Sequence, residues 1–213
     1  MRNKLLLLLA LVFCLSAVMP WESGYATWKW MLVEMRPEFI SNDLEIPTVS
    51  GIEAIPEDLK DKIPTTGKII LVDFRRPSYK KRLWVIQNQQ VKLFCRVAHG
   101  KNSGEVFATQ FSNDQGSFKS SIGYFLTGEA YLGEKGWAMK LHGQDRGIND
   151  LAYERGIVFH GGEYVSKAFL LRNGRIGRSH GCFVTEPQNN AKIIRWCQNG
   201  TRVWVVGHQP VRI

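Results

Sequence analysis

The sequence predicts a mainly β domain of mixed, mostly antiparallel strands with a few short helices. Three observations carry this prediction. Compact apolar runs occupy residues 68–74 and 82–86. After a polar stretch at residues 87–90, apolar and polar residues alternate through 91–97, which predicts a hairpin with one buried face. Further strand candidates are residues 121–127, 137–141, 156–160 and 201–206.

Two helices are expected between these strands. One covers residues 164–173 and ends at Gly174, because glycine readily adopts the left-handed conformation that closes many helices. The other follows Thr185, which we expect to cap the first turn while Gln188 reaches back to it. Pro187 suits an early helical position, since its missing N–H has no partner there. This helix should run to about Cys197 and stop before residues 199–200.

The first residues have the layout of a secretory signal peptide. Arg2 and Lys4 precede an apolar run at residues 5–15, and small residues follow at positions 24 and 26. We expect cleavage after Ala26 and export, with the periplasm of a Gram-negative envelope as the destination. An uncleaved membrane anchor is the alternative, but the apolar run is shorter than the about 20 residues that a span needs. No stable membrane insertion is therefore expected after cleavage.

Residues 27–66 differ from the rest of the chain. Apolar residues at 28, 31, 32 and 35 have helical spacing, and four prolines then punctuate a segment with few strand-like runs. We interpret residues 27–66 as an N-terminal arm that packs along the domain formed by residues 67–213.

The charge of the chain favours an anionic partner. The formal net charge is +9, and loss of residues 1–26, which include Arg2, Lys4 and Glu22, lowers it by one. A basic exported domain suits a wall polymer, a membrane surface or peptides with free carboxylates. Nucleic acid is not expected, because no clustered Lys and Arg residues alternate with aromatic ones. The sequence does not define an oligomeric state.

The mature chain would keep three cysteines, Cys95, Cys182 and Cys197. An odd number leaves at least one thiol outside any intramolecular disulfide. One arrangement is a Cys95–Cys197 disulfide with a free Cys182. The other is two buried, reduced cysteines beside a reactive one, and the sequence leaves both open.

The densest group of chemically active residues lies between positions 157 and 187. An apolar strand candidate ends at His160, and glycine-rich turns lead to Cys182. Acyl transfer needs a nucleophile, a base within hydrogen-bond reach and backbone donors for the oxyanion. A thiolate is a good nucleophile, and cationic neighbours such as Arg178 and His180 lower the pKa of a thiol. Gly181 lets the backbone approach a substrate closely.

These residues resemble the L,D-transpeptidases with the YkuD-type catalytic domain, which remodel peptidoglycan. The family pattern is a His-Gly followed by Ser-x-Gly-Cys, here His160-Gly161 and residues 179–182. The interval of 22 residues from His160 to Cys182 resembles a branch with an extended spacer. Residues 111–113, 116–117, 121–123, 127–129 and 147–150 are also similar to that branch. The resemblance implies a YkuD-like β-sandwich or barrel.

The resemblance also implies the site residues and the reaction. Cys182 would be the nucleophile, His160 the general base and later acid, and Gly181 with Cys182 the oxyanion donors. Cys182 would attack the third residue of a peptidoglycan tetrapeptide stem, release D-alanine and pass the acyl group to an amine. Transfer to water would make the same site an L,D-carboxypeptidase. No cofactor is implied.

Other residues receive lesser roles. Family members usually carry Arg soon after the cysteine, where this chain has Phe183 and Val184, so we substitute Arg178 as the group that binds the substrate carboxylate. Ser179 joins the catalytic set, although a structural bond to nearby backbone is the alternative. Possible substrate contacts are Arg178, His180, His142 and Gly161.

The sequence has three alternatives to cysteine acyl transfer: a metal site, a wall-binding module and a different hydrolase. A metal site at the histidines and Cys182 is disfavoured, because the chain has no Cys-x-x-Cys or His-x-x-x-His pair, and we assign no metal. A catalytically inactive wall-binding module of the same fold is one alternative function. A hydrolase of another exported peptide or amide is the other.

Overall fold

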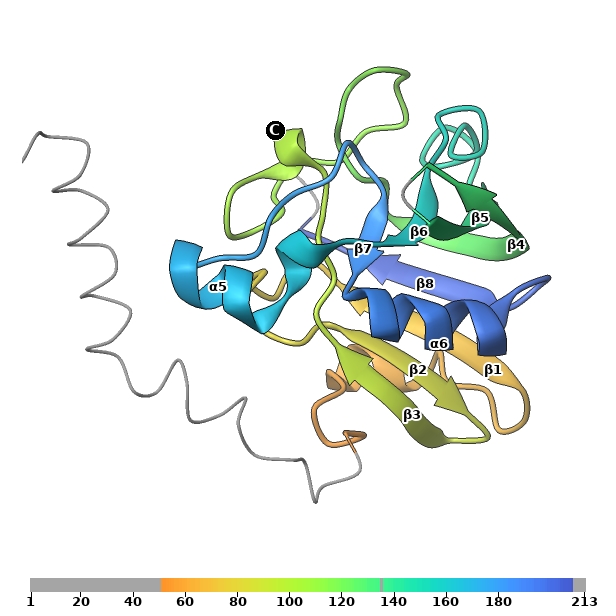
Figure 1. The fold of residues 1–213 in the computed structure, drawn as a ribbon. Coiled ribbons are helices and arrows are strands. Elements are labelled where there is room, and N and C mark those ends of the chain that lie inside the picture. Colours follow the sequence, from red (N-terminus) through yellow and green to blue (C-terminus); the bar gives the residue numbers. More distant parts are fainter. Residues whose placement is uncertain (1–50, 135, 209–213) are drawn as a thin grey trace, which may run out of the picture.

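The structure is a computed structural model that describes residues 51–134 and 136–208. Within these ranges eight strands form one mixed sheet in the order β3–β2–β1–β8–β4–β5–β6–β7 (Figure 1). The strands are β1 (Lys68–Asp73), β2 (Leu83–Gln87), β3 (Gln90–Cys95), β4 (Gly123–Gly133), β5 (Gly136–Gly143), β6 (Val158–Gly161), β7 (Phe183–Thr185) and β8 (Arg202–Val206). The α-helices are α4 (Glu57–Lys60), α5 (Lys167–Asn173) and α6 (Pro187–Cys197), and the 3-10 turns are η1 (Lys101–Ser103) and η2 (Glu163–Val165).

The sheet nearly closes into a barrel. The N–H of Ala98, just after β3, donates to the carbonyl oxygen of Val184 in β7 at 2.7 Å, so the two edge strands are brought together. The β1–β8 and β6–β7 pairs are parallel, and the other pairs in the described sheet are antiparallel. The predicted mainly β fold with mixed, mostly antiparallel strands is confirmed.

The inner face of the curved sheet carries the main core. Alternate residues of each strand point inward, as the strand period of two requires, and they meet apolar residues of α6. Phe159 of β6 and Phe183 of β7 lie with ring centroids 5.3 Å apart. Ile193 and Cys197 of α6 belong to the same buried cluster. α6 crosses the front of the sheet in Figure 1.

A second core covers the outer face of β1 and β2. Ile69 and Trp84 pack there against Ile55 and Leu59, which precede the sheet in the chain. The described end of the expected N-terminal arm therefore lies against the domain. Burial of both faces also explains why residues 68–74 and 82–86 are almost unbroken apolar runs.

The helix at residues 164–173 is shorter than predicted. Its first residues form η2, and α5 begins only after Ser166, whose Oγ accepts the N–H of Phe169 at 3.2 Å. Gly174 ends the helix with φ 67°, as expected.

The start of α6 differs from the expectation. Thr185 belongs to the short strand β7, which was not predicted, and Glu186 is the N-cap without a side-chain cap bond. The capping pair of Thr185 and Gln188 was therefore wrong, because Thr185 is held by strand pairing to Gly161. Pro187 takes the first helical position, as expected.

The predictions for the signal peptide and for the helix at residues 28–35 lie outside the described residues. In the part of the chain that the structure describes, no helix has the length and apolar character needed to cross a membrane.

Candidate active site

His160 lies in β6, and Cys182 lies directly before the neighbouring strand β7. β6 and β7 are parallel, with Phe159 beside Phe183 and His160 beside Val184. The side chain of Cys182 packs against the buried cluster that contains Val184, the strand partner of His160. Phe159 and Phe183 point to the other side, into the main core. The predicted nucleophile and base are therefore on adjacent segments of the fold.

The ring of His160 is oriented by the backbone that follows it. Nδ1 lies 2.9 Å from the carbonyl oxygen of Gly161. A carbonyl only accepts hydrogen bonds, so Nδ1 carries the proton in this contact and Nε2 carries the basic lone pair. Gly161 also passes close to α6: a Cβ there would lie 3.0 Å from Cα of Pro187. Gly161 thus positions the base and does not line the pocket beside it.

Cys182 is the accessible thiol of the described chain. It is half-buried, and its Sγ donates to the carbonyl oxygen of Gly156 at 3.5 Å. Cys95 and Cys197 are buried, and burial raises their thiol pKa values to about 12 and about 11. Cys95, Cys182 and Cys197 form no disulfide with one another, which matches the arrangement of two buried, reduced cysteines beside a more exposed one.

The turn before Cys182 needs glycine at position 181. Gly181 has φ +126°, which L side chains rarely adopt. A Cβ there would lie 2.7 Å from Cδ1 of Ile157 and 2.9 Å from the carbonyl oxygen of Lys119. The carbonyl oxygen of Gly181 accepts the hydroxyl of Ser120 at 2.9 Å. The backbone next to Cys182 is therefore enclosed on several sides.

Ser179 ties this turn together from inside. Its Oγ accepts the N–H of Gly181 at 3.0 Å and donates to the carbonyl oxygen of Cys182 at 2.7 Å. Ser179 is buried, so both bonds are shielded from water. The N–H of Gly181, predicted to face an oxyanion, is thus engaged by Ser179 in this structure.

A buried Arg–His pair supports the turn from below. The N–H of Ser179 donates to the carbonyl oxygen of His99, and Nδ1 of the His99 ring lies 2.7 Å from Nη2 of Arg82. Nε2 of His99 donates to the carbonyl oxygen of Gly104 at 3.0 Å. Burial and the nearby charge of Arg82 lower the pKa of His99 to about 3. His99 is therefore a neutral structural residue near neutral pH.

Arg178 is occupied by a carboxylate. Its Nη1 contacts Glu105 Oε1 at 2.6 Å and the carbonyl oxygens of Lys101 and Gly104. Glu105 also pairs with Arg175 at 3.2 Å. The structure thus uses the guanidinium of Arg178 to hold the loop around η1, which leaves it poorly suited to the substrate-carboxylate role that we predicted.

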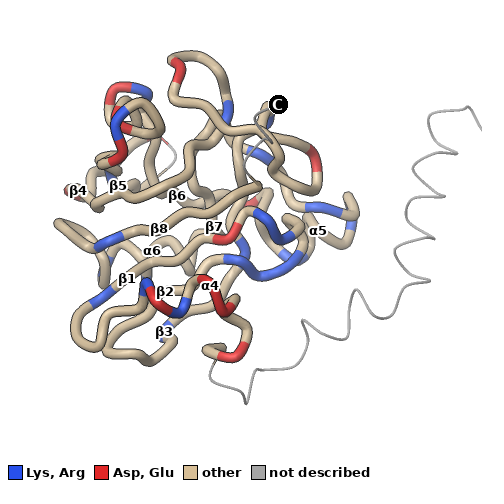
Figure 2. Tube along the Cα trace, turned by 180° about the vertical axis from the view of Figure 1, so that it is seen from behind, with Lys and Arg blue, Asp and Glu red and all other residues tan. Residues whose placement is uncertain are grey.

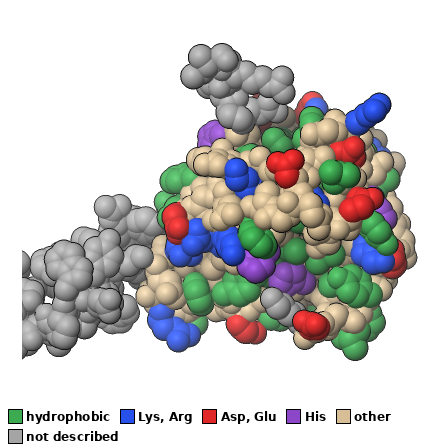
Figure 3. All heavy atoms as spheres, turned by 90° about the horizontal axis from the view of Figure 1, so that it is seen from above, with side chains coloured by type: hydrophobic (Ala, Val, Ile, Leu, Met, Phe, Trp, Pro, Cys, Tyr) green, Lys and Arg blue, Asp and Glu red, His purple; other side chains and the backbone are tan. Residues whose placement is uncertain are grey.

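His180 lies on an aromatic and cationic rim beside the turn. Its exposed ring packs on Phe118 with centroids 4.6 Å apart, and Lys101 Nζ lies 4.2 Å from the centroid of the Phe118 ring. Phe118 has φ +54°, a strained conformation for a bulky residue. The view from above shows two histidine side chains side by side among hydrophobic and basic ones (Figure 3). We call Lys101, Phe118 and His180 the basic rim.

His142 lies on the outer face but away from His160. Ala138 is the β5 residue paired with His160, and His142 is four residues further along β5, about 13 Å at the usual rise per residue. Its ring stacks on Tyr153 with centroids 4.9 Å apart. The structure does not bring His142 into the pocket beside His160.

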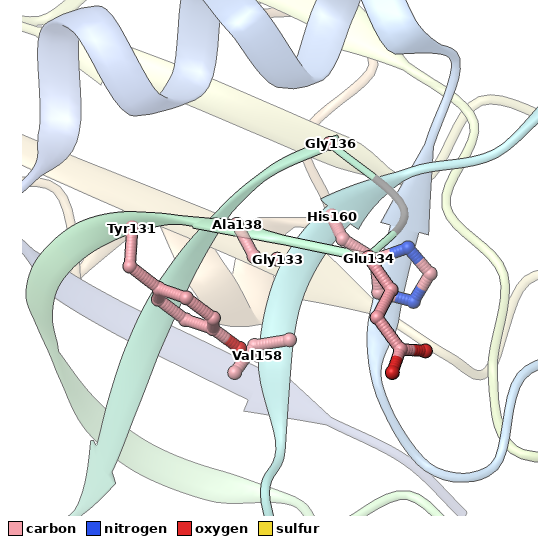
Figure 4. Close-up of a pocket in the computed structure, with 7 residues that line it drawn as sticks. All are labelled: Tyr131, Gly133, Glu134, Gly136, Ala138, Val158 and His160. Atoms are coloured by element: carbon pink, nitrogen blue, oxygen red, sulfur yellow. The ribbon is translucent and has the colours of Figure 1, made fainter.

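A pocket of about 370 Å³ adjoins His160 under the β4–β5 hairpin. Figure 4 shows the ring of His160 and the carboxylate of Glu134 on one side, and the ring of Tyr131 with Val158 on the other. Ala138 and two glycines complete the lining. The pocket has a single acidic group and an aromatic wall beside the predicted base.

Sequence reasoning missed Arg155, Glu134 and the basic rim residues Lys101 and Phe118. None stands next to the Ser-x-Gly-Cys motif, so no local pattern marks them. The available signal was the motif-like segment at residues 111–123, which supplies hydrogen-bond acceptors to Arg155. The segment at residues 147–150 is linked to it through Asn113 and Asp150. Within residues 51–134 and 136–208, no group of three or more His, Cys, Asp or Glu residues is placed to hold a metal ion.

Comparison with known proteins identifies a family match. The model of the L,D-transpeptidase catalytic domain matches residues 47–206. The match begins inside the segment that we expected to be an arm, so it includes the end of that segment. No curated protein matches the chain.

Several solved structures resemble the fold at low identity. For an L,D-transpeptidase from Stackebrandtia nassauensis, identity is 18%, the TM-score is 0.43, and the match covers 75% of this chain and 64% of that one. For the helical cell shape determining protein Pgp2 from Campylobacter jejuni, identity is 14%, the TM-score is 0.44, and the match covers 68% of this chain and 49% of that one. For an L,D-transpeptidase from Mycobacterium smegmatis, identity is 14%, the TM-score is 0.43, and the match covers 66% of this chain and 58% of that one. This chain spans less than two thirds of each of these solved chains, and the likeness is one of fold alone.

Proposed function

The chain belongs to the L,D-transpeptidase catalytic domain family, and from that premise we propose that it is an exported cysteine acyltransferase acting on peptidoglycan stem peptides through a thioester on Cys182. Family membership supports a peptidoglycan transpeptidase-type function. The observation that carries the finer proposal is the placement of His160 and Cys182 on adjacent segments, with a pocket directly beside the imidazole.

The proposed acylation step uses His160 first as base and then as acid. Nε2 takes the thiol proton of Cys182, and the thiolate attacks the carbonyl carbon of the third stem residue. The tetrahedral intermediate collapses, the bond to the terminal D-alanine breaks, and the imidazolium protonates the departing amine. The products are free D-alanine and an acyl thioester on Cys182.

The deacylation step reverses these roles. An amine of a second stem attacks the thioester carbonyl while His160 accepts its proton, and the proton returns to the sulfur as the thiolate leaves. Attack by water would release the shortened stem instead, which is the carboxypeptidase outcome. Both acceptors use the same intermediate.

The oxyanion requires a donor at the turn. The Gly181 N–H faces Ser179 Oγ at 3.0 Å, so it serves the oxyanion only if that bond is released or shared. The N–H of Cys182 is the second predicted donor. Ser179 acts in this proposal as the residue that positions the amide of Gly181 and the carbonyl group of Cys182.

Two surfaces near His160 and Cys182 are complementary to the charged groups of the proposed substrate. The basic rim offers the ammonium group of Lys101 to a stem carboxylate, in place of Arg178, which is paired with Glu105. The Glu134 carboxylate in the pocket suits an amine-bearing side chain or acceptor. Lys and Arg positions also gather around α5 (Figure 2), which suits an anionic wall polymer.

Export to the periplasm is part of the proposal. It is supported by the signal-like start of the sequence and by the location of peptidoglycan outside the cytoplasm. Peptide sequencing of the secreted protein would test it, since an N-terminus at Met1 would contradict cleavage.

The decisive experiment is mass spectrometry of products from defined tetrapeptide muropeptides. We expect the wild type to release D-alanine, Cys182→Ala to release none, and Cys95→Ala to retain release, because Cys95 is buried in the core. Unchanged turnover by Cys182→Ala would exclude the thioester mechanism.

A thiol probe separates this proposal from a wall-binding module without activity. We expect iodoacetamide at neutral pH to label Cys182 alone, because burial raises the pKa of the other two thiols. A Cys182 that stays unlabelled would favour the binding module. If Cys182 is labelled but the protein converts none of the defined muropeptides, hydrolysis of another exported peptide or amide would be favoured.

A further inference from the structure

Arg155 makes an unusual set of contacts directly before β6. Nη1 donates to the carbonyl oxygen of Ser112 at 2.6 Å and contacts Ser121 Oγ. Nη2 donates to Ser117 Oγ at 3.1 Å and to the carbonyl oxygen of Lys119 at 2.7 Å. One guanidinium thus binds four positions of a loop that precedes it by more than 30 residues.

The loop that Arg155 binds lies against the turn at residues 179–182, which we call the nucleophile turn. The carbonyl oxygen of Lys119 would lie 2.9 Å from a Cβ at Gly181, so the two backbones touch. Ser120 donates its hydroxyl to the carbonyl oxygen of Gly181 at 2.9 Å. A shift of the loop would therefore move the backbone that carries Cys182.

The segment that contains Arg155 also reaches Cys182 from the other side. Gly156, the next residue, accepts the Sγ hydrogen bond of Cys182 at 3.5 Å. Ile157 Cδ1 would lie 2.7 Å from a Cβ at Gly181. Residues 155–157 and 119–120 thus enclose the turn, and the guanidinium joins the two.

The guanidinium lies in an environment with little compensation for its charge. No carboxylate of the described residues forms an ion pair with it, and its buried Nε has no hydrogen-bond partner among them. Burial lowers the pKa of Arg155, whereas the negative charges of Asp114 and of ionised Cys182 raise it. Because a charge–charge interaction is mutual, the same contact favours the thiolate of Cys182.

We propose that Arg155 is a positioning residue for Cys182: it clamps residues 112–121 against the nucleophile turn, and its positive charge, next in the chain to the Gly156 carbonyl that accepts the Sγ hydrogen bond, favours the thiolate. This inference rests on the proposed nucleophilic role of Cys182. It also gives a physical function to the motif-like segments at residues 111–123, because their serines and backbone carbonyls are the acceptors that hold the guanidinium.

The test compares the pH dependence of Cys182 alkylation by iodoacetamide in three variants. Arg155→Gln removes the charge, Arg155→Lys keeps the charge without the planar fork, and Arg172→Gln removes an exposed charge on α5 as the matched control. Tyr164, a titratable group near the sulfur, and the proposed base His160 are unchanged in all three. Folding is checked by circular dichroism.

In Arg155→Gln we expect alkylation at pH 7 to slow roughly tenfold, with the midpoint moved to higher pH. In Arg155→Lys the midpoint should stay near that of the wild type, whereas turnover of tetrapeptide should fall roughly tenfold, because one ammonium cannot bind four acceptors. Arg172→Gln should match the wild type in both assays.

An unchanged alkylation midpoint in folded Arg155→Gln would overturn the inference. If Arg155→Gln does not fold, the test rests on Arg155→Lys. Wild-type turnover by Arg155→Lys, or an alkylation midpoint displaced to higher pH in that variant, would also overturn the inference. Alkylation of Cys182 needs no substrate, so the alkylation midpoint tests the role of Arg155 alone. Failure of the proposed transpeptidation would be seen differently: Cys182 would react with iodoacetamide, but no D-alanine would be released.

Discussion

The nucleophile turn and the tip of the β4–β5 hairpin flank the same base and are built in opposite ways. In the turn, Ser179 and Gly181 are buried, and their polar backbone groups are held by Ser120, His99 and Lys101 from distant parts of the chain and by Ser179 Oγ within the turn. At the hairpin tip, Leu132 and Trp137 are 70% and 58% exposed. The turn is fixed on all sides, whereas the hairpin presents apolar surface to solvent.

This difference separates two tasks of the proposed enzyme. A nucleophile must stay within a fraction of an ångström of its productive place, and that needs a dense network of contacts. A surface that receives a polymer needs apolar and aromatic area, and it tolerates change. Substitutions in the turn should therefore reduce catalysis, and substitutions near the hairpin should mainly change substrate affinity.

The sharpest test of the comparison replaces one glycine in each region by alanine. Gly181 and Gly136 both have φ above +90°, but a Cβ at Gly181 meets Ile157 and Lys119, whereas a Cβ at Gly136 has nothing within 4 Å. We expect Gly181→Ala to lower kcat/KM about 100-fold or more by displacing Cys182. Gly136→Ala should cost only about 1 kcal/mol of unfolding free energy from backbone strain.

These two variants are measured by D-alanine release and by thermal unfolding. Equal loss of activity in both would remove the distinction between the regions.

The next effect concerns the hydroxyl inside the turn. Ser179→Ala leaves the N–H of Gly181 and the carbonyl oxygen of Cys182 without their partner, which should cost about 1–3 kcal/mol of stability. We expect kcat to fall roughly tenfold with little change in KM. A variant with normal kcat would show that Ser179 does not position the nucleophile.

The support below the turn should make stability depend on pH. The pKa of His99 is about 3 in the folded protein and 6.5 in its ordinary state, so the unfolded chain binds a proton first as the pH falls. The free energy of unfolding should be fully retained above pH 6.5. Between 6.5 and 3 it should decline by up to about 1.4 kcal/mol per pH unit.

Urea unfolding at several pH values measures this effect. Between pH 6.5 and 5, His99→Gln should be less stable than the wild type but should show a flatter dependence, because glutamine does not titrate. An equally steep dependence in that variant would assign the effect to other groups.

The smallest expected effect lies on the hairpin side. Glu134→Gln removes the acidic group of the pocket without changing its shape, and we expect a rise of a few-fold in KM for the amine acceptor with kcat unchanged. Steady-state kinetics with a fixed donor stem would measure it. A fall in kcat with constant KM would instead place Glu134 in the chemistry.

Much of the fold followed from local patterns. The hairpin of β2 and β3 and the end of α5 at Gly174 were predicted, because alternation and a left-handed glycine are properties of a few neighbouring residues. β7 was not, since three residues after a glycine turn carry no period of their own. Thr185 looked like a helix cap in the sequence, but pairing with Gly161 made it part of that strand.

The site divides in the same way. Residue type and motif predict His160 and Cys182 as the reactive pair, and in the fold Val184 pairs with His160 and packs near Cys182. Charge and proximity in sequence point to Arg178 as a substrate contact, but in the fold it pairs with Glu105, 73 residues earlier. Gly181 was chosen as an oxyanion donor, and only the folded turn showed that Ser179 engages its amide.

The sequence by itself determined which groups the proposed chemistry would use: a thiol, an imidazole and the glycines that let the backbone bend beside them. Which charges and donors remain available to that chemistry was decided only by the tertiary structure. The physical reason is distance along the chain, because Arg155 meets Lys119 across 36 residues and Ser120 meets Gly181 across 61. Such contacts depend on how the sheet closes, and no local pattern encodes them.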